Sequence, residues 1–307
     1  MRIAVMGAGA VGGYLGALLA RAGHEVSLVA RGRHLQAIQG SGLQVRSEQG
    51  EFTAIVQATD QSSDIGPVDL VIHSVKTYHN PEAVPLLHPL LEENTTVLCV
   101  QNGVDSWEQV QQALPPNTVL PGAVYIEASV AEPGVVQQQG NVRRLVFGEA
   151  DGSMTPRIQA IASAMQGVGM PTEISNDITS VLWNKWLFIT ALAGTTCAAH
   201  MGLAELLAVP ESRLLVVQVL REIDSLGRKL GVNLDSNIVD KTLHYMETEA
   251  SSLKASMQKD METGRPMELD ALTGAVVRLG KEAGISTPAN EAIYALLKPH
   301  ALRNSGA

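Results

Sequence analysis

The pattern Gly7-Ala-Gly9-Ala-Val-Gly12, which directly follows a short β-branched run, constrains the fold of this 307-residue chain more than any other feature. Residues 3–6 predict a strand, and residues 11–22, closed by Gly23, predict a helix. At such a junction the first glycine permits a tight turn, the second lets a pyrophosphate approach the backbone, and the third lets the helix pack on the strand. The phosphates then lie on the free N–H groups at the positive end of the helix dipole. We expect this turn to bind a dinucleotide, with a ligand-free turn as the alternative, through Gly7, Ala8, Gly9, Ala10, Val11 and Gly12.

The composition is that of a folded globular protein with no basic footprint for nucleic acid. Hydrophobic residues make up 45% and charged residues 17%, against about 25% charged in a typical soluble chain, which argues against disorder. The net charge of -9 makes nucleic acid an unexpected partner. The uncharged residues 3–20 are interrupted by five glycines, unlike a signal peptide, and the apolar run at 181–193 is too short to span a bilayer. We therefore expect no membrane partner.

Cysteine and histidine usage argues against a metal and against disulfides. The two cysteines, Cys99 and Cys197, have no metal-type spacing, and the eight histidines form no His-Glu-x-x-His motif. We expect no bound metal and a cytoplasmic location, where thiols stay reduced. A homodimer is a candidate assembly.

Alternating strand and helix patterns predict an α/β N-terminal domain, a Rossmann-type doubly wound sheet, followed by an all-α C-terminal domain. From residue 176 the apolar spacing becomes helical and glycines punctuate it. The expected domains are 1–175, the α/β domain that contains the glycine pattern, and 176–307, the helical domain. Later strands are expected at 26–29, 43–45, 69–74 and 96–100, helices near 81–91 and 106–114, and extra antiparallel strands at the sheet edge at 119–130, 134–139 and 145–147.

The residue after the second predicted strand indicates which dinucleotide binds. An NAD site places Asp or Glu about twenty residues after the glycines, to bind the ribose hydroxyls. This chain has Arg31 there instead, and Arg33 follows. Arginine pairs bidentately with a 2′-phosphate and stacks on adenine, so Arg31 favours NADP (NADPH) over NAD. A solvated loop charge is the alternative for Arg31 and the preferred interpretation of Arg33.

Two other predicted strands end in polar residues, Lys76 after one and Asn102 after the other. Ligands of open α/β sheets bind beyond the carboxyl ends of the strands. We expect Lys76 and Asn102 to meet the nicotinamide or the substrate. Asn102-Gly103 is also a common turn dipeptide, so spacing alone leaves the role of Asn102 open.

Lys185 lies in an apolar helical pattern, where an unpaired ammonium is costly to bury. Burial lowers the pKa of a lysine and suits it as a proton donor near neutrality. The alternative, slightly favoured by the residues alone, is a lysine whose stem covers apolar surface while its head reaches water.

A second polar group brackets the turn Thr263-Gly-Arg-Pro266. Proline is typical of the first helical position, which would place Glu268 in a first helical turn, where carboxylates often only complement the dipole. Ser256 and Asp260 have i, i+4 spacing, typical of a pair on a helix surface.

Taken in order, these pieces resemble the ketopantoate reductase (2-dehydropantoate 2-reductase) family along essentially the whole chain. The matching segments are Gly7-Ala-Gly-Ala-Val-Gly12, Arg31, Lys76, Gln101-Asn102-Gly103, Trp183-x-Lys185, Ser256-Met257-x-x-Asp260, Glu268-Leu-Asp270, and Gly-Ile-Ser-Thr-Pro288 followed by Asn290.

The resemblance implies NADPH-dependent reduction of a small 2-keto acid to a D-2-hydroxy acid, with ketopantoate (2-dehydropantoate) giving D-pantoate in pantothenate biosynthesis. It implies that Lys185 protonates the developing alkoxide and that Glu268 assists at the lysine and the substrate hydroxyl. It further implies that Ser256 binds the carboxylate and that Lys76 and Asn102 position cofactor and substrate.

One departure from the family bears on the substrate. The family's typical helix has asparagines four and eight residues after its lysine, where this chain has Ile189 and Ala193. A pocket lined by Ile189 has little reason to prefer a hydroxylated substrate. The alternative is therefore a D-2-hydroxyacid dehydrogenase of the same family acting on bulkier apolar 2-keto acids. A remote alternative is a non-catalytic NADP(H)-binding sensor.

Overall fold

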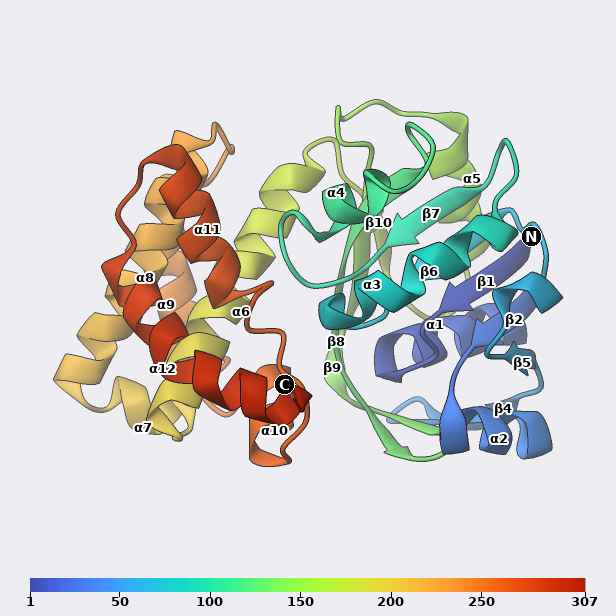
Figure 1. Ribbon diagram of the computed structural model, residues 1–307, viewed down its shortest axis with the longest axis horizontal. Coiled ribbons are helices and arrows are strands. Elements are labelled where there is room, and N and C mark those ends of the chain that lie inside the picture. The colour runs from blue at the N-terminus through green and yellow to red at the C-terminus, as the bar shows by residue number, and fades with distance from the viewer. Residues whose placement is uncertain (307) are drawn as a thin grey trace. The chain divides into compact units, whose positions relative to one another are not determined.

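The computed structural model describes residues 1–306, which divide into two compact units. The first unit, called here the sheet unit, comprises residues 1–101 and 105–178. The second, the helical unit, comprises residues 102–104 and the chain from Thr179 onward. The short segment 102–104 therefore leaves the sheet unit after a strand and clusters with helices that lie far along the sequence. Figure 1 shows the α/β character of the first unit and the helices of the second.

Within the described residues, the sheet unit contains one mixed ten-stranded sheet of order β4-β3-β9-β8-β7-β6-β1-β2-β5, with β10 pairing β9. The strands from β8 through β5 in that order run parallel, whereas the β8–β9 and β3–β4 pairs are antiparallel. The strands are β1 (Arg2–Met6), β2 (Glu25–Val29), β3 (Leu43–Ser47), β4 (Gly50–Ala54), β5 (Gln57–Thr59), β6 (Leu70–His73), β7 (Thr96–Cys99), β8 (Val119–Glu132), β9 (Val135–Phe147) and β10 (Thr172–Ile174).

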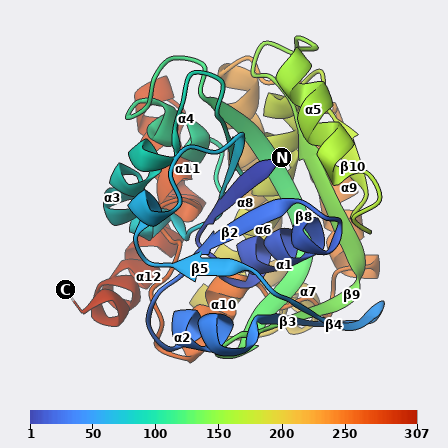
Figure 2. The same ribbon diagram turned by 90° about the vertical axis from the view of Figure 1, so that its right-hand side faces the viewer.

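Helices cover both faces of this sheet, which confirms the predicted doubly wound α/β class. Alternate side chains of a strand point to opposite faces: Ile3 and Val5 of β1 join one apolar core, and Ala4 and Met6 join another. The sheet curls around the first helix, which contacts β1 and β2 as well as β8 and β9 (Figure 2). The helices of this unit are α1 (Ala10–Arg21), α2 (Gly32–Ser41), α3 (Asn80–Ala83), α4 (Ser106–Gln111) and α5 (Pro156–Met165), with 3₁₀ turns η1 (Ser62–Asp64), η2 (Thr77–His79) and η3 (Pro85–Leu90).

The structure corrects three local predictions. The helix expected at 81–91 is only the single turn α3 followed by η3, because Pro85 and Pro89 lack the N–H groups that an α-helix needs. The two strands expected at 134–139 and 145–147 are one continuous strand, β9. The strands expected at 119–130, 134–139 and 145–147 do not lie at the sheet edge: β9 pairs with β3 as well as with β8, and β3 pairs in turn with β4. Sequence patterns did not predict α2, α5, β4, β5 or β10.

The helical unit packs around its own apolar core, as the all-α prediction required. Trp186, Leu187 and Ala191 of its first helix, α6, are buried in that core. The helices are α6 (Ile178–Ala199), α7 (Leu203–Leu207), α8 (Pro210–Lys229), α9 (Ile238–Thr248), α10 (Ser256–Glu262), α11 (Thr273–Ala283) and α12 (Pro288–Ser305).

Candidate active site

The glycine loop between β1 and α1 has the geometry of a phosphate cradle. Gly7 has φ +97°, a backbone conformation that glycine adopts without strain. A Cβ added at Gly12 would overlap Ser74 Oγ and the Gly7 carbonyl oxygen, so the third glycine permits close packing. A Cβ at Gly9 would meet nothing within 4 Å, so there is open space in front of that backbone.

Two side chains that the sequence reasoning did not assign fix this loop from behind. Ser74 Oγ donates to the Gly7 carbonyl oxygen at 2.9 Å. His34 Nδ1 accepts the Gly134 N–H at 3.0 Å, so Nε2 carries the ring proton and donates to the Ala8 carbonyl oxygen at 2.8 Å. Ser74 could have been singled out from the sequence, because it is the polar residue that directly follows a buried strand. His34 carried none, because its partner lies 100 residues away.

The loop and the first turn of α1 fit a dinucleotide. Gly9 is the N-cap of α1 and has no side chain to cap the first amides, and that turn contains no acidic residue. Those N–H groups and the helix dipole therefore favour an anion in the open space at Gly9. The residues present can accept a pyrophosphate, because, chain neighbours and the backbone of α1 apart, nothing lies within 4 Å of the place that a Cβ of Gly9 would take.

Arg31 and Lys76 follow the strands on either side of β1. Arg31 is exposed and is the N-cap of α2, two residues after β2, and Lys76 is half-buried at the start of η2, three residues after β6. The charge of Arg31 reaches η2: burial is the main cause that lowers the pKa of His79, and Arg31 lowers it further. The Glu82 carboxylate, 3.8 Å from His79 Nδ1, acts in the opposite direction. This edge of the sheet thus carries positive charge, as an adenosine 2′-phosphate would require.

Three polar side chains from distant parts of the chain meet within the helical unit. Lys185 Nζ, on α6, donates to Asn102 Oδ1 at 3.0 Å. Asn102 Nδ2 in turn donates to Glu268 Oε2 at 3.3 Å, so the amide links the lysine to the carboxylate. Asn102 reaches this cluster because the segment 102–104, after β7, belongs to the helical unit.

The surroundings of Lys185 prepare it to exchange a proton near neutral pH. Its helix neighbours Trp183 and Trp186 are buried. Desolvation lowers the pKa of Lys185 to about 8, although the negative charge of Glu268 opposes the shift. The ammonium is hydrogen-bonded to Asn102, which differs from a lysine head extended into bulk water.

Glu268 reaches the cluster from an irregular segment, and the prediction that it lies in a first helical turn is wrong. Pro266 begins no helix, since α11 starts at Thr273. Met267 and Leu269 are buried in the apolar core of the helical unit, so contacts with that core, and not the local helix-start pattern, determine the backbone here. Glu268 is only 4% exposed.

The remaining predicted substrate residues do not join this cluster by hydrogen bonds. Ser256 is exposed at the start of α10, and its expected partner Asp260 is buried and pairs instead with Arg265 Nε at 3.1 Å. Ile189 is half-buried one helical turn after Lys185, and Ala193 is buried one turn further. Both pack with the apolar core of the helical unit.

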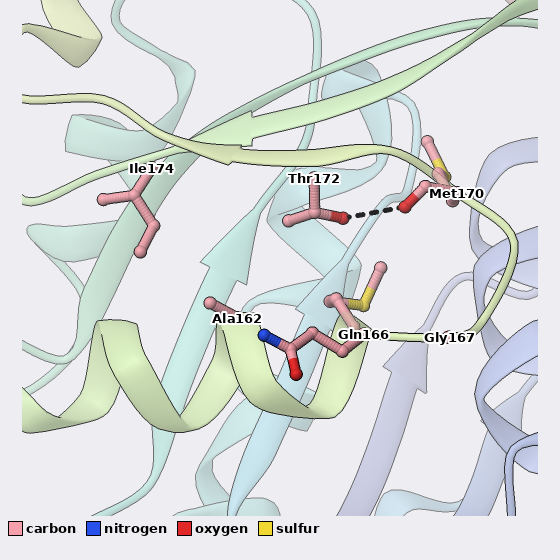
Figure 3. Close-up of a pocket in the computed structure, with 7 residues that line it drawn as sticks. Ala162, Gln166, Gly167, Met170, Thr172 and Ile174 are labelled. Atoms are coloured by element: carbon pink, nitrogen blue, oxygen red, sulfur yellow. Dashed lines mark hydrogen bonds between the residues drawn. The ribbon is translucent and has the colours of Figure 1, made fainter.

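A cavity elsewhere in the sheet unit lacks the features of an active site. It lies between α5 and β10 and is lined by Ala162, Met165, Gln166, Gly167, Met170, Thr172 and Ile174 (Figure 3). Its hydroxyl, Thr172 Oγ1, donates to the Met170 carbonyl oxygen at 3.0 Å. The lining contains no ionisable side chain and none of the predicted site residues.

Within residues 1–306, no group of three or more His, Cys, Asp or Glu side chains is arranged to hold a metal ion. None of the helices in that range is both long enough and apolar enough to cross a membrane.

Comparison with known families agrees with this arrangement across both units. The model of the ketopantoate reductase PanE/ApbA family matches residues 3–152, and the model of the family's C-terminal region matches residues 177–301. The chain belongs to the ketopantoate reductase family. It is therefore a pyridine-nucleotide-dependent oxidoreductase acting on a CH–OH group.

Individual relatives match the chain end to end at modest identity. A 2-dehydropantoate 2-reductase of Mesorhizobium japonicum is 33% identical, covering 97% of each chain. The crystal structure of a PanE/ApbA family ketopantoate reductase from Ralstonia eutropha is 30% identical with a TM-score of 0.92, covering 99% of this chain and 100% of that one. A D-mandelate dehydrogenase, solved with NADH and anilino(oxo)acetate, has a TM-score of 0.90 at 23% identity and covers 99% of both chains, which shows a shared fold.

Proposed function

We propose that this protein reduces 2-dehydropantoate to D-pantoate with NADPH, in the cytoplasm. The observation that supports the proposal most is the cluster in which Asn102 links Lys185 to Glu268. It holds a lysine, which can donate the proton that reduction of a ketone requires, beside an amide and a carboxylate that can orient it. The two buried, unpaired cysteines fit a reducing compartment.

NADPH, when bound, supplies the hydride that the ketone carbon accepts. As the π bond of the carbonyl breaks, negative charge grows on the ketone oxygen. Lys185 Nζ then donates the proton that completes the hydroxyl. Lys185 is left as a neutral amine and regains a proton from solvent. A pKa of about 8 keeps it mostly protonated at neutral pH while making proton release easy.

Asn102 and Glu268 keep Lys185 in place during this step. The Asn102 carbonyl oxygen accepts from Nζ and so orients the ammonium. The charge of the Glu268 carboxylate raises the pKa of Lys185 against desolvation and so favours the protonated form. We also assign to Glu268 the role of accepting a hydrogen bond from the substrate hydroxyl. We assign the binding of the substrate carboxylate to Ser256.

The sheet unit holds the cofactor in this proposal. The loop from Gly7 to Gly12 receives the pyrophosphate at the N-terminus of α1, and Arg31 pairs with the 2′-phosphate. Lys76 positions the nicotinamide half of the cofactor. Residues 1–175 thus serve as the NADP-binding domain and residues 176–307 as the substrate and catalytic domain.

A second candidate, reduction of bulkier apolar 2-keto acids to D-2-hydroxy acids, is favoured by one observation. Ile189 and Ala193 lie one and two helical turns after Lys185 on α6 and offer no hydrogen bond to a hydroxylated substrate. An apolar wall discriminates weakly between a hydroxylated and an unhydroxylated acid.

A panel of keto acids tests both candidates. The oxidation of NADPH is followed at 340 nm with 2-dehydropantoate, its unhydroxylated branched analogue, and an aromatic 2-keto acid. The highest kcat/KM with 2-dehydropantoate supports the proposed function, and a higher value with an apolar acid supports the second candidate. Absence of turnover with every acid, in a protein that binds NADPH, would refute both and indicate the non-catalytic sensor.

A further inference from the structure

A partly buried network of two amides and one imidazole lies behind the loops that follow β6 and β7, with His73 and Gln101 buried and Asn80 half-buried. Asn80 and Gln101 form a reciprocal amide pair: Gln101 Nε2 donates to Asn80 Oδ1 at 2.7 Å, and Asn80 Nδ2 donates to Gln101 Oε1 at 3.2 Å. His73 Nε2 donates to the same Asn80 Oδ1 at 3.0 Å. Gln101 Nε2 also donates to the Val75 carbonyl oxygen at 2.9 Å. All these residues belong to the sheet unit.

The orientation of every group in this network is determined. A backbone carbonyl oxygen only accepts, so the Val75 carbonyl fixes which end of the Gln101 amide is the NH₂ group. Gln101 then fixes the Asn80 amide, and Asn80 requires the Nε2–H tautomer of His73. Burial lowers the pKa of His73 to about 4, so the ring stays neutral and this arrangement does not change over the physiological pH range.

The network joins the two loops that present predicted active-site residues. Val75 and Asn80 lie on either side of Lys76, so Gln101 and its partner clamp both ends of the turn that carries the lysine. Gln101 is also the residue immediately before Asn102, which hydrogen-bonds with Lys185 and Glu268. A single buried side chain, 6% exposed, therefore holds the turn around Lys76 and directly precedes Asn102 in the chain.

We propose that Gln101, oriented by Asn80 and His73, is a positioning residue for the reaction: it fixes the Lys76 turn and the Asn102 backbone together. The claim rests on the proposed function and deepens it. Gln101 contacts neither cofactor nor substrate in this account. It acts by keeping Asn102 at the distance where its carbonyl accepts from Lys185 and by keeping Lys76 at the sheet edge.

The test compares two variants of the network with a matched control. Gln101→Met keeps the length of the side chain and removes all of its polar contacts, and Asn80→Ala breaks the amide pair while leaving the bond from Gln101 to Val75. The control is Gln111→Met. Gln111 also bonds to backbone, donating to the Pro115 carbonyl oxygen at 2.7 Å and accepting the Val119 N–H at 2.8 Å, but it does so at the amino end of β8.

Four measurements are made on each full-length variant: melting temperature, the NADPH dissociation constant from cofactor fluorescence, kcat, and the pH profile of kcat/KM. We expect Gln101→Met to lower kcat at least about tenfold, since small misplacements of reacting groups have large effects on rate. NADPH binding should weaken several-fold through Lys76. The fall of kcat/KM at alkaline pH should begin at lower pH. A displaced Asn102 no longer accepts a hydrogen bond from the charged form of Lys185, so the pKa of Lys185 falls further. Asn80→Ala should show the same changes to a smaller degree.

The control separates positioning from loss of stability. Gln111→Met should lower the melting temperature about as much as Gln101→Met does. Its kcat, the alkaline fall of its kcat/KM and its NADPH dissociation constant should stay at wild-type values. The proposal is overturned if both network variants change these three quantities no more than Gln111→Met does. If the wild-type protein reduces no keto acid, the proposed function fails by itself. In that case the NADPH dissociation constants alone test the positioning role. Weaker NADPH binding in the network variants but not in Gln111→Met supports the role, and equal dissociation constants in all variants overturn it. If Gln101→Met does not fold, Asn80→Ala decides on the same criteria.

Discussion

The protonation of Lys185 predicts a steep loss of activity at alkaline pH. A general acid works only in its protonated form, and desolvation places the pKa of Lys185 at about 8. The protonated fraction is then about nine-tenths at pH 7, one half at pH 8 and about one-tenth at pH 9. Between pH 7 and pH 10, kcat/KM should fall about a hundredfold by the same relation, with a slope approaching tenfold per pH unit.

Initial rates over pH 6–10, at saturating NADPH, low keto acid and constant ionic strength, measure this profile. Glu268→Gln provides an internal check. The Glu268 carboxylate raises the pKa of Lys185, so its removal should shift the limb to lower pH. A profile that stays flat to pH 10, or a limb that moves to higher pH in Glu268→Gln, would refute the assignment of Lys185 as the titrating acid.

Four further variants test other parts of the proposed site. Arg31→Ala should weaken NADPH by about 1–3 kcal/mol, the value of a hydrogen bond between charged groups, and leave NADH nearly unchanged; equal losses in a fluorescence titration of both cofactors would contradict the 2′-phosphate assignment. Ile189→Asn should raise the ratio of kcat/KM for 2-dehydropantoate to that for its unhydroxylated branched analogue, and an unchanged ratio would show that this side chain does not reach the substrate. Gly9→Ala should fold with a near-normal melting temperature, because its Cβ enters open space. It should bind NADPH weakly, because that Cβ keeps the pyrophosphate away from the backbone. Gly12→Ala should instead be strongly destabilised by its overlap with Ser74 and Gly7, and the reverse order of melting temperatures would rule out this geometry.

Local patterns predicted the elements whose causes are local. The glycine spacing after a β-branched run predicted both the turn at Gly7 and the start of α1, because Gly7 needs a positive φ and Gly12 packs against Val5 and the Gly7 carbonyl oxygen of the same strand and turn. The same reasoning failed at Pro266, which satisfies a helix-start pattern. There the burial of Met267 and Leu269 determines the backbone, and burial depends on the packed unit rather than on neighbours in sequence.

The meeting of Asn102, Lys185 and Glu268 was beyond the reach of spacing arguments. Asn102 lies 83 residues from Lys185 and 166 from Glu268, so no periodicity relates them. Each residue alone had an ordinary explanation, such as a turn asparagine or a snorkelling lysine. Only the resemblance to the ketopantoate reductase family grouped them before the structure did. The roles of His34 and Asn80 are harder still to predict from sequence, because they depend on partners in other elements of the fold.

The central claim, that Lys185 supplies the proton, is tested most directly by Lys185→Met. Methionine keeps an unbranched apolar stem of similar length and removes the ammonium, so the variant should fold and bind NADPH like the wild type. Loss of a general acid costs about 10²–10⁴-fold, and we expect kcat to fall at least about a hundredfold with the best keto acid of the panel. Steady-state turnover measured beside an NADPH titration decides the matter. A kcat near the wild-type value, in a folded variant that binds NADPH normally, would remove Lys185 from the mechanism.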